Sequence, residues 1–505
     1  MLIIKTSMKK HAFLLSILIV ILSTSCSKKI PKDFQYLNVN PVIYPEYTNS
    51  SIPWNIAPLN FNIKEDADEY LCEAHSHKGE SLLCEGRKVQ WDIKKWKQLL
   101  KLNKGDTLYI DIYVNKDSHW FKYQAIKNFI APEAIDDYIS YRLIEPSYAT
   151  YEYMTINQRN ITNFDENIIF SNIPLSVNED GQCINCHSFQ NYNKTKRFQF
   201  HVRQYKGGTV FVTPKGIKKV SLKTNYTISA GVYPAWHPTK NIIAYSVNNT
   251  HQSFYAKDKA KVEVFDSRSN LILYDVDRNE IRTIGNDTTV METFPSWSLD
   301  GKYLYYSSAK YPDGVTVSSK DKILLKCKDI HYNIYRRSFD LHTQKFGPAE
   351  LVYNASAINK SATFPRISPD NRYLLFTLAD YGNFHIWHKS SDLQLIDLTT
   401  GALSAMKEIN SPRAESYHSW SSNGSWIIFS SRRDDGSYTR PYISYFKNGR
   451  SNKPFILPQK DPDFYKALFK SFNIPEFMVE PVTVTQRELM NAVDKKATNA
   501  TFSQK

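Results

Sequence analysis

Four segments in the second half of the chain share one order of hydrophobic and polar positions. Each begins with an aromatic residue, passes through a polar turn and ends in an apolar run of strand-forming side chains. Continuous apolar runs of this length between turn signals are typical of strands buried on both faces. The order therefore predicts a repeated β unit. The segments are YPAWHPTKNIIAYS (233–246), FPSWSLDGKYLYYSS (294–308), FPRISPDNRYLLFTL (364–378) and YHSWSSNGSWIIFSS (417–431).

A strand–turn–strand pattern follows each segment, so that each repeat supplies about four strands. A weaker copy of the repeat occupies residues 198–222. Four-stranded units repeated at this spacing predict the blades of a β-propeller. We expect five or six blades over 197–458, with an open two-sheet architecture as the alternative. The following hairpins are LILYDVDRNEIRTI (271–284), YRRSFDLHTQKF (335–346), LQLIDLTTGALSAM (393–406) and YISYFKNGRSNKPFIL (442–457).

These repeats resemble the TolB-type propeller repeat, a relative of the WD repeat. The shared pattern is aromatic-Pro-x-Trp-Ser-x-Asp-Gly-Lys followed by apolar residues, and FPSWSLDGKYLYY matches it best. The resemblance covers about half of the chain. It implies the fold and says almost nothing about activity.

The front of the chain is also rich in predicted strands. Runs such as LNFNI (59–63) and DTLYIDIYV (106–114) are separated by turn signals, and 92–103 favours a short helix. We therefore expect a mainly β protein with a β-sandwich-like domain over 41–160. A connector over 161–196 leads to the propeller, and 459–505 is expected to be a C-terminal extension.

The first 26 residues are typical of an export signal. Lys5, Lys9 and Lys10 precede an apolar run from Ala12 to Leu22, which is short for a membrane-spanning helix. Small residues then lead to Cys26, an arrangement that resembles the bacterial lipobox. We expect cleavage of a signal peptide over 1–25, lipidation of Cys26 and a tether over 26–40. An ordinary secretory signal or an uncleaved anchor are the alternatives.

Two cysteines of the front domain are placed symmetrically about Lys78. A hairpin that turns at His77-Lys78-Gly79 would set Cys72 directly opposite Cys84. Such a pair in an oxidising compartment predicts a disulfide. Two reduced apolar positions on one strand face are the alternative.

The segment Cys183-Ile184-Asn185-Cys186-His187 carries the c-type haem attachment signature. Two thiols can add to the two haem vinyl groups, and the adjacent His187 can ligate the iron. We expect one covalent haem c on a polar loop. His201 and Met154 are the candidates for the distal ligand, with an open or water-occupied position as the alternative. A local disulfide, a thioredoxin-like redox pair and a zinc site are the alternatives.

The order of front domain, CxxCHSF motif and propeller resembles a group of exported lipoproteins of Bacteroides-type bacteria. CINCHSF, FHVR (200–203) and SAGVYPAWHPT (229–239) carry this likeness. The basic residues Lys28 and Lys29 after Cys26 favour the periplasmic face of the outer membrane, with the cell surface as the alternative.

The composition adds two restrictions to the expected function. The net charge of +14 over 505 residues is spread without a long basic run, so we expect no nucleic-acid partner. The chain contains no GxSxG, HExxH or P-loop motif, and we assign no catalytic residue.

The first hypothesis is envelope electron transfer or haem-linked sensing with a protein partner. A haem-free interaction scaffold is the second hypothesis, and an envelope hydrolase is the third.

Overall fold

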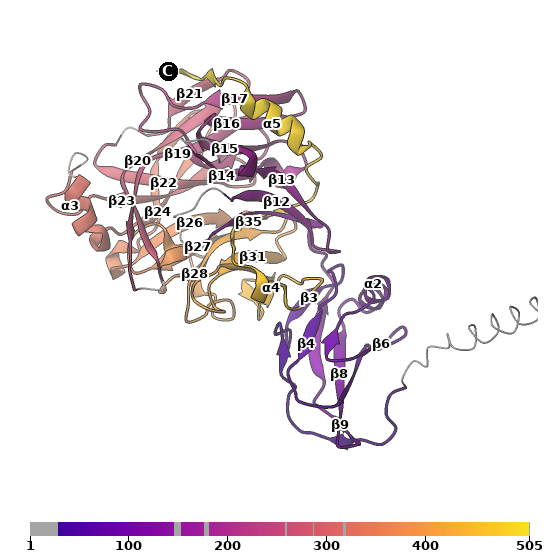
Figure 1. The fold of residues 1–505 in the computed structure, drawn as a ribbon. Coiled ribbons are helices and arrows are strands. Elements are labelled where there is room, and N and C mark those ends of the chain that lie inside the picture. Colours follow the sequence, from indigo (N-terminus) through magenta and orange to yellow (C-terminus); the bar gives the residue numbers. More distant parts are fainter. Residues whose placement is uncertain are drawn as a thin grey trace, which may run out of the picture.

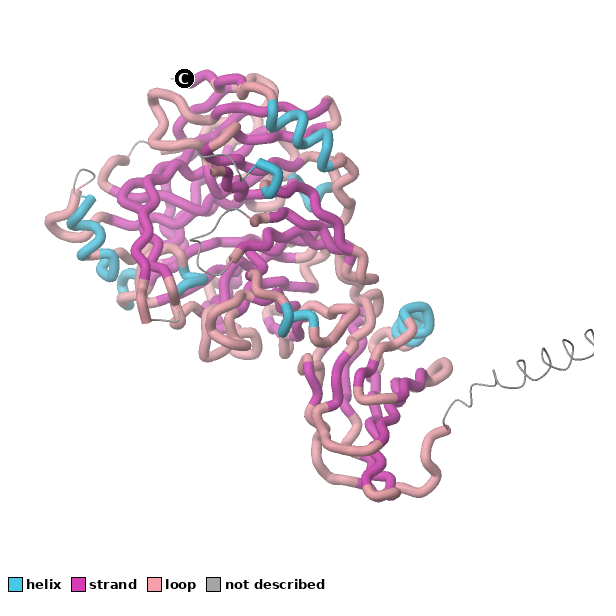
Figure 2. The backbone as a smooth tube through the Cα atoms, in the orientation of Figure 1, coloured by secondary structure: helices cyan, strands magenta, loops and turns pink. Residues whose placement is uncertain are grey.

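The computed structural model describes residues 29–145, 153–175, 181–257, 260–285, 287–316 and 320–503. Most of these residues lie in strands, and the few helices are short (Figure 2). A smaller part made from the front of the chain projects from a larger part that holds the repeats (Figure 1). No helix within the described ranges is long and apolar enough to cross a membrane.

The smaller part contains two sheets that share one core. In the first, the long strand β8 (Thr107–Lys116) pairs with β5, β9 and β10, while the second has the order β2-β4-β7. Phe61 and Val89 from the second sheet pack in the same core as Leu108 and Ile110 from the first. The other strands are β1 (Gln35–Tyr36), β2 (Ile43–Tyr44), β3 (Ser51–Pro53), β4 (Phe61–Ile63), β5 (Glu69–His75), β6 (Leu82–Glu85), β7 (Lys88–Val89), β9 (His119–Lys122) and β10 (Ile126–Ala131).

The predicted helix of the front domain is α2 (Ile93–Leu102). Asp92 caps its N-terminus, because the carboxylate accepts hydrogen bonds from the main-chain N–H groups of Lys94 and Lys95 at 3.0 and 2.9 Å. Trp96, Leu99 and Leu100 are its buried residues. The helix is therefore held by one apolar stripe against the sheets.

The expected hairpin around Lys78 is present as β5 and β6. Cys72 lies directly opposite Cys84 in the antiparallel register, as predicted. Both are free thiols in the structure, with Cys72 buried and Cys84 half-buried. The register is confirmed, and the disulfide stays a prediction.

The larger part contains six sheets of antiparallel strands among the described residues. The four sequence repeats each begin one of these sheets, and the weak copy at 198–222 supplies β15, β16 and β17. Four of the sheets are built from β14 (Gln182–Phe189), β15 (Phe198–Gln204), β16 (Gly208–Thr213) and β17 (Gly216–Ser221); β18 (Val232–Trp236), β19 (Ile242–Phe254), β20 (Val262–Asp275) and β21 (Glu280–Thr283); β22 (Val290–Trp297), β23 (Tyr303–Lys310), β24 (Asn333–Phe339) and β25 (Phe346–Tyr353); and β26 (Ser361–Ile367), β27 (Tyr373–Ala379), β28 (Asp392–Asp397) and β29 (Leu403–Ala405).

The fifth sheet is formed by β30 (Glu415–Trp420), β31 (Trp426–Ser431), β32 (Arg440–Lys447), β33 (Arg450–Ser451) and β34 (Phe455–Ile456). The sixth joins β11 (Tyr138–Ile144), β12 (Thr155–Asn160) and β13 (Glu166–Ser171) to β35 (Ser471–Met478). Its strands β11 to β13 lie partly in the region expected to belong to the front domain and the connector. Since their fourth partner comes more than 300 residues later, no local pattern could assign them to this sheet.

The first strands of successive sheets contact one another from β14 through β18, β22, β26 and β30 to β35. A hydrogen bond from His187 of β14 to the carbonyl oxygen of Ile474 in β35 joins the two ends of this series. This arrangement is a propeller-type fold.

Each of these six strands bends at one residue in the left-handed region. The φ angles lie between +50° and +53°, and a register shift marks a β-bulge at the same place. Non-glycine residues seldom adopt this conformation, so its recurrence identifies equivalent positions. The six residues are Cys186, Tyr233, Phe294, Phe364, Tyr417 and Ile474.

The last part of the chain is integrated into the larger part. Helix α5 (Gln486–Asp494) begins with a capping box between Thr485 and Glu488 and contacts β13, β16 and β17. Strands β36 (Thr498–Asn499) and β37 (Thr501–Phe502) then add parallel edges to β17 and β21. The expected extension is thus an ordered cover of these sheets.

Candidate functional site

The CINCH segment lies within β14, where the sequence predicted a polar loop. Its last residues, Cys186-His187-Ser188-Phe189, occupy the same place as Tyr417-His418-Ser419-Trp420 in β30. Cys186 thus holds the left-handed position that an aromatic residue holds in four of the six strands. The polar residues of DGQC predicted a loop, but the segment is a strand that is buried by neighbours on both sides.

His187 is buried and hydrogen-bonded to the neighbouring sheet. It is 3% exposed, and its Nε2 donates to the carbonyl oxygen of Ile474 at 3.1 Å. Burial, with the positive charge of Arg142 second, lowers its pKa to about 3. The ring is therefore neutral at pH 7 and its Nδ1 has no protein partner.

His418 has the same surroundings in β30. It is 2% exposed, its Nε2 donates to the carbonyl oxygen of Leu375 at 3.1 Å, and burial lowers its pKa to about 3. The remaining four strands carry proline at this position. The placement of His187 is thus a property of the repeated fold.

The two thiols of the motif face a cavity of about 440 Å³. Cys183 is half-buried, and Cys186 is 7% exposed. The wall of the cavity takes residues from four of the six sheets and from the segment that connects β27 to β28. It is lined by Arg142, Ile144, Met154, Cys183, Asn185, Cys186, Arg203, Gln204, Tyr233, Thr250, Gln252, Val264, Phe384, Trp387, Tyr417 and Ile474.

Two arginines give the cavity a positive charge that its lining does not offset. Arg142 is 7% exposed; its Nη1 donates to the carbonyl oxygen of Ile184 at 3.1 Å, and its Nε has no partner. Arg203 is exposed at the same wall. Neither forms an ion pair with a carboxylate among the described residues, and no lining residue is acidic. Burial raises the pKa of Cys186, so this thiol is neutral at pH 7 and adds no counter-charge.

Aromatic rings form the apolar part of the wall. Phe384, Trp387 and Tyr417 belong to one cluster in which Phe294 and Phe364 stack with ring centres 3.9 Å apart. Three of these residues hold the left-handed position of their strand. The ring of bulges therefore packs apolar side chains against one end of the cavity.

A hairpin extension covers another side of the cavity. Strands β19 and β20 extend beyond their sheet, and carboxylates on β20 bind the segment around η5 (His385–Trp387). Asp266 accepts from Asn383 Nδ2 at 2.6 Å, and burial raises its pKa to about 6. Glu263 accepts from His388 Nε2 at 2.9 Å. Burial raises the pKa of Glu263, but the hydrogen bond and charge of His388 bring it below the ordinary value.

The structure separates the two candidates for a distal iron ligand. Met154 is 1% exposed and lines the cavity together with both thiols. His201 lies outside this lining, with its Nδ1 3.0 Å from Thr209 Oγ1. Burial lowers its pKa to about 3. Cys26 lies outside the described residues.

The residues fit a haem in part. Two thiols, aromatic walls and two arginines suit a flat macrocycle that carries carboxylates. The iron ligand does not fit, because His187 is absent from the lining and its Nε2 is bound to Ile474. In this arrangement His187 is not placed to ligate iron, and the attachment of haem stays a prediction.

The sequence pointed to neither Arg142 nor the hairpin extension. Arg203 lies within FHVR, a segment noted only for its resemblance to other lipoproteins. Arg142 carries no local signal, since its position at the cavity depends on the pairing of β11 with the distant β35.

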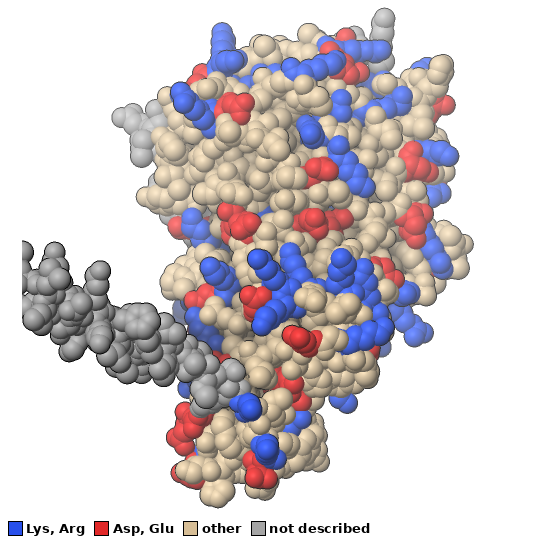
Figure 3. All heavy atoms as spheres, turned by 90° about the vertical axis from the view of Figure 1, so that its right-hand side faces the viewer, with Lys and Arg blue, Asp and Glu red and all other residues tan. Residues whose placement is uncertain are grey.

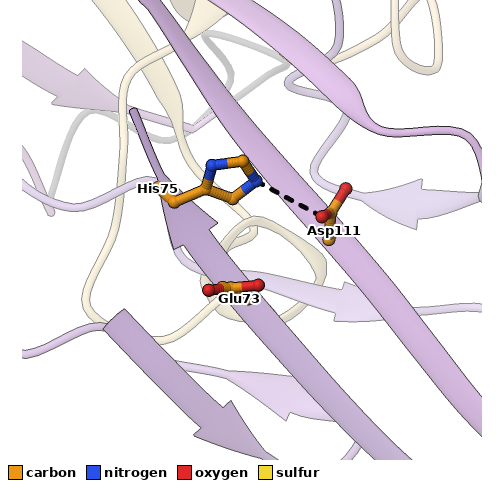
Figure 4. A group of neighbouring side chains, drawn as sticks. All are labelled: Glu73, His75 and Asp111. Carbon is orange, nitrogen blue, oxygen red and sulfur yellow. Dashed lines mark hydrogen bonds and ion pairs between the residues drawn. The ribbon is translucent and has the colours of Figure 1, made fainter. Parts of the chain in front are cut away.

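A second cluster of polar side chains lies on the front domain (Figure 4). Glu73, His75 and Asp111 come close enough to share a metal ion, and His75 Nε2 lies 3.3 Å from Asp111 Oδ2. Lys122 Nζ contacts the same carboxylate oxygen at 2.7 Å. The ammonium group of Lys122 therefore already neutralises this carboxylate, and we assign no site here.

Comparisons with known proteins do not assign the chain to a family. No family model and no curated protein matches it. An oligogalacturonate lyase in complex with manganese is 12% identical, covering 63% of this chain and 74% of that chain with a TM-score of 0.35. One of two prolyl endopeptidases is 10% identical over 63% of this chain and 42% of its own, with a TM-score of 0.30. A periplasmic gluconolactonase of Pseudomonas aeruginosa is 12% identical over 63% and 68%, with a TM-score of 0.27. At these scores the neighbours carry no argument about the site, and the mainly β, propeller-type fold rests on the sheets themselves.

Proposed function

We propose that this chain is a binding protein whose central cavity takes an anionic ligand with a flat apolar body. The observation that carries the proposal is Arg142, a buried guanidinium that faces the cavity without a carboxylate partner among the described residues. A buried charge is costly unless it is paired. A bound carboxylate or phosphate would supply the missing partner and accept paired hydrogen bonds from the guanidinium.

The rest of the lining supports the same class of ligand. Arg203 offers a second positive group at the exposed part of the wall, while Tyr233, Tyr417 and Trp387 offer aromatic faces. Pockets with a mostly apolar wall and a few directed polar groups are typical of small-molecule sites. A volume of about 440 Å³ lies in the range of such sites.

A covalent haem is the second candidate for the occupant. The specific observation in its favour is that Cys183 and Cys186 line the same cavity as both arginines. Haem would supply electron transfer or ligand sensing, and the two arginines would bind its carboxylates. The protein would need another group than His187 on the iron, and Met154 is the lining residue with a suitable sulfur.

The proposed architecture and location follow the same reasoning. The six sheets favour a six-bladed propeller that closes between β35 and β14, with a sandwich-like front domain. The signal-like N-terminus supports export and lipidation at Cys26, with the outer membrane as the expected site. Docking to an envelope protein remains a hypothesis.

The anion proposal can be tested with two matched probes. Anilinonaphthalene sulfonate carries a charge, and N-phenylnaphthylamine has the same rings without it. We expect the charged probe to bind one site and to weaken about tenfold or more in Arg142→Met, with partial retention in Arg142→Lys. Arg268→Met, an arginine outside the lining, serves as the control. Equal binding of both probes, or no effect of Arg142→Met, would contradict the proposal.

The haem candidate has its own measurement. The chain is exported to a periplasm with haem-attachment machinery, and its reduced-minus-oxidised spectrum and intact denatured mass are recorded. A retained haem that is lost in Cys183→Ala/Cys186→Ala would support it. A colourless protein would remove haem as the occupant and leave the anion site to be judged by the probe experiment.

A further inference from the structure

The exposed side of α2 is a row of lysines. Lys94, Lys97 and Lys101 follow one another at spacings of three and four residues, which places them along one face. Lys104 follows just beyond the C-terminal end of the helix, and Lys95 lies next to Lys94 at the edge of this face. The stretch 93–105 contains these five lysines and no acidic residue.

The protein itself does not neutralise this row. None of the five lysines forms an ion pair with a carboxylate of the described ranges. Lys97 Nζ contacts only the hydroxyl of Thr162, at 3.3 Å, and Lys104 Nζ lies 3.6 Å from the ring centre of Trp54. Two acidic residues flank the stretch: Asp92 caps the helix, and Asp106 lies 2.6 Å from His77 Nδ1. Like charges at these spacings repel one another, so the row destabilises the helix unless an external anion offsets it.

The row lies on the side of the molecule where the described chain begins. In Figure 1 both α2 and the first described residues of the chain lie at the right, and Figure 3 shows Lys and Arg side chains gathered at mid-height on that face. Trp96, Leu99 and Leu100 of α2 are buried in their own domain, and the exposed Leu102 lies at the last position of the helix, beside the lysine row. The surface can therefore attract a partner by charge, without inserting apolar side chains into it.

We propose that this lysine row on α2 docks the front domain against an anionic phospholipid surface. Phosphate headgroups match a row of flexible, strongly hydrated ammonium groups, because neither side requires fixed geometry. A tether that starts on the same side would hold this face toward the bilayer. The inference does not depend on the ligand of the cavity.

The test uses the chain from Ser27 onward, which contains every described residue, and sedimentation with lipid vesicles. Binding is expected to phosphatidylcholine vesicles with about 30% phosphatidylglycerol and not to phosphatidylcholine alone. It should weaken steeply between about 50 and about 300 mM NaCl. In Lys94→Gln/Lys97→Gln/Lys101→Gln the partition coefficient should fall about a hundredfold.

A matched control removes the same charge elsewhere. Lys302, Lys345 and Lys407 are exposed lysines of the larger part, and their combined change to glutamine should leave binding within about threefold. Cooperative thermal unfolding of both variants, with a midpoint no lower than that of the unsubstituted chain, would show that they fold. Equal loss in both variants, equal binding to neutral vesicles, or binding to soluble heparin without binding to anionic vesicles would overturn the proposal.

Discussion

Replacing His187 and His418 by phenylalanine tests whether the histidine of CINCH belongs to the repeated fold. Both rings are buried, and each donates one hydrogen bond to a main-chain carbonyl of the preceding sheet. Phenylalanine fills a similar volume and removes the donor. The two substitutions should therefore have the same effect if the two histidines have the same role.

The expected loss follows from the group that is left without a partner. Leaving a buried acceptor such as the carbonyl of Ile474 unsatisfied costs about 1–3 kcal/mol. For a unit of this size, 1 kcal/mol shifts the unfolding midpoint by about 2 °C. We expect His187→Phe and His418→Phe each to lower the midpoint by about 2–6 °C at pH 7.5.

The pH dependence gives a second readout that volume changes do not affect. Both pKa values are lowered to about 3 in the folded state, below the ordinary value of about 6.5. Between these values only the unfolded chain binds the proton, so stability is present at neutral pH and falls as the pH decreases. Each histidine contributes about 1.4 kcal/mol per pH unit to this slope. Each substitution should therefore make the loss between about pH 6 and pH 4 less steep by that amount.

The assay is thermal unfolding followed by tryptophan fluorescence at several pH values, with far-UV circular dichroism to confirm the fold. His342→Phe, at an exposed turn, is the control and should change neither readout. The reasoning would be refuted if His418→Phe behaved as expected while His187→Phe left both the midpoint and the pH slope unchanged.

Three further predictions concern other contacts. Glu263→Gln should weaken the hydrogen bond between residue 263 and His388, which is worth about 1.5–3 kcal/mol. Amide hydrogen exchange in 381–388 should then become at least about tenfold faster. Unchanged exchange would show that the carboxylate does not hold the hairpin extension. After oxidative refolding, peptide mapping should find Cys72 and Cys84 joined by a disulfide. Cys84→Ser should abolish this peptide pair. Two free thiols after complete oxidation would exclude the disulfide. Asp136→Ala removes the acceptor for the main-chain N–H and the hydroxyl of Ser422, both at 2.6 Å. The free energy of unfolding should fall by about 1.5–3 kcal/mol, and proteolysis between the smaller and the larger part should become faster. An unchanged digestion pattern would contradict this.

The repeats could be predicted because their hydrophobic order is local. FPSWSLDGKYLYY contains the inner bulge, the turn and the second strand of one sheet within a few residues. Its tryptophan has a structural reason, since Trp297 Nε1 donates to the carbonyl oxygen of Ala235 in the preceding sheet at 3.0 Å. The strand β35 carries the related order Ile474-Pro475-Glu476-Phe477, but it lacks both tryptophan and the aspartate-glycine turn. Its place in the fold depends on pairing with β11 and could not be inferred from its own residues.

The site shows the same limit. The thiols of Cys183 and Cys186 were identified from their spacing, which is a local property. Whether they and His187 point to one side depends on the conformation of the strand, and the left-handed bulge at Cys186 turns the thiol to the cavity while His187 packs against the neighbouring sheet. The cavity's arginines come from β11 and β15, so their convergence is set by the ring of sheets.

Comparing the six equivalent strands shows which part of CINCH the fold requires. The position after the bulge is histidine in two strands and proline in four, so a histidine there needs no cofactor to account for it. The two cysteines, in contrast, do not recur in the other strands. Cys186 is the only cysteine among the six bulge residues. The residues equivalent to Cys183 in the other strands are Ala230, Met291, Ser361, Ala414 and Ser471. None of the other five strands carries a thiol at either place, and their one sulfur there is the Met291 thioether, which accepts a hydrogen bond from Tyr332 Oη at 3.9 Å. The two thiols are thus the part of the motif that the repeated architecture leaves unexplained, and both face the cavity that carries the unpaired Arg142. Chemistry specific to this protein should therefore be sought at the thiols and the arginine, with His187 as a fixed element of the wall behind them.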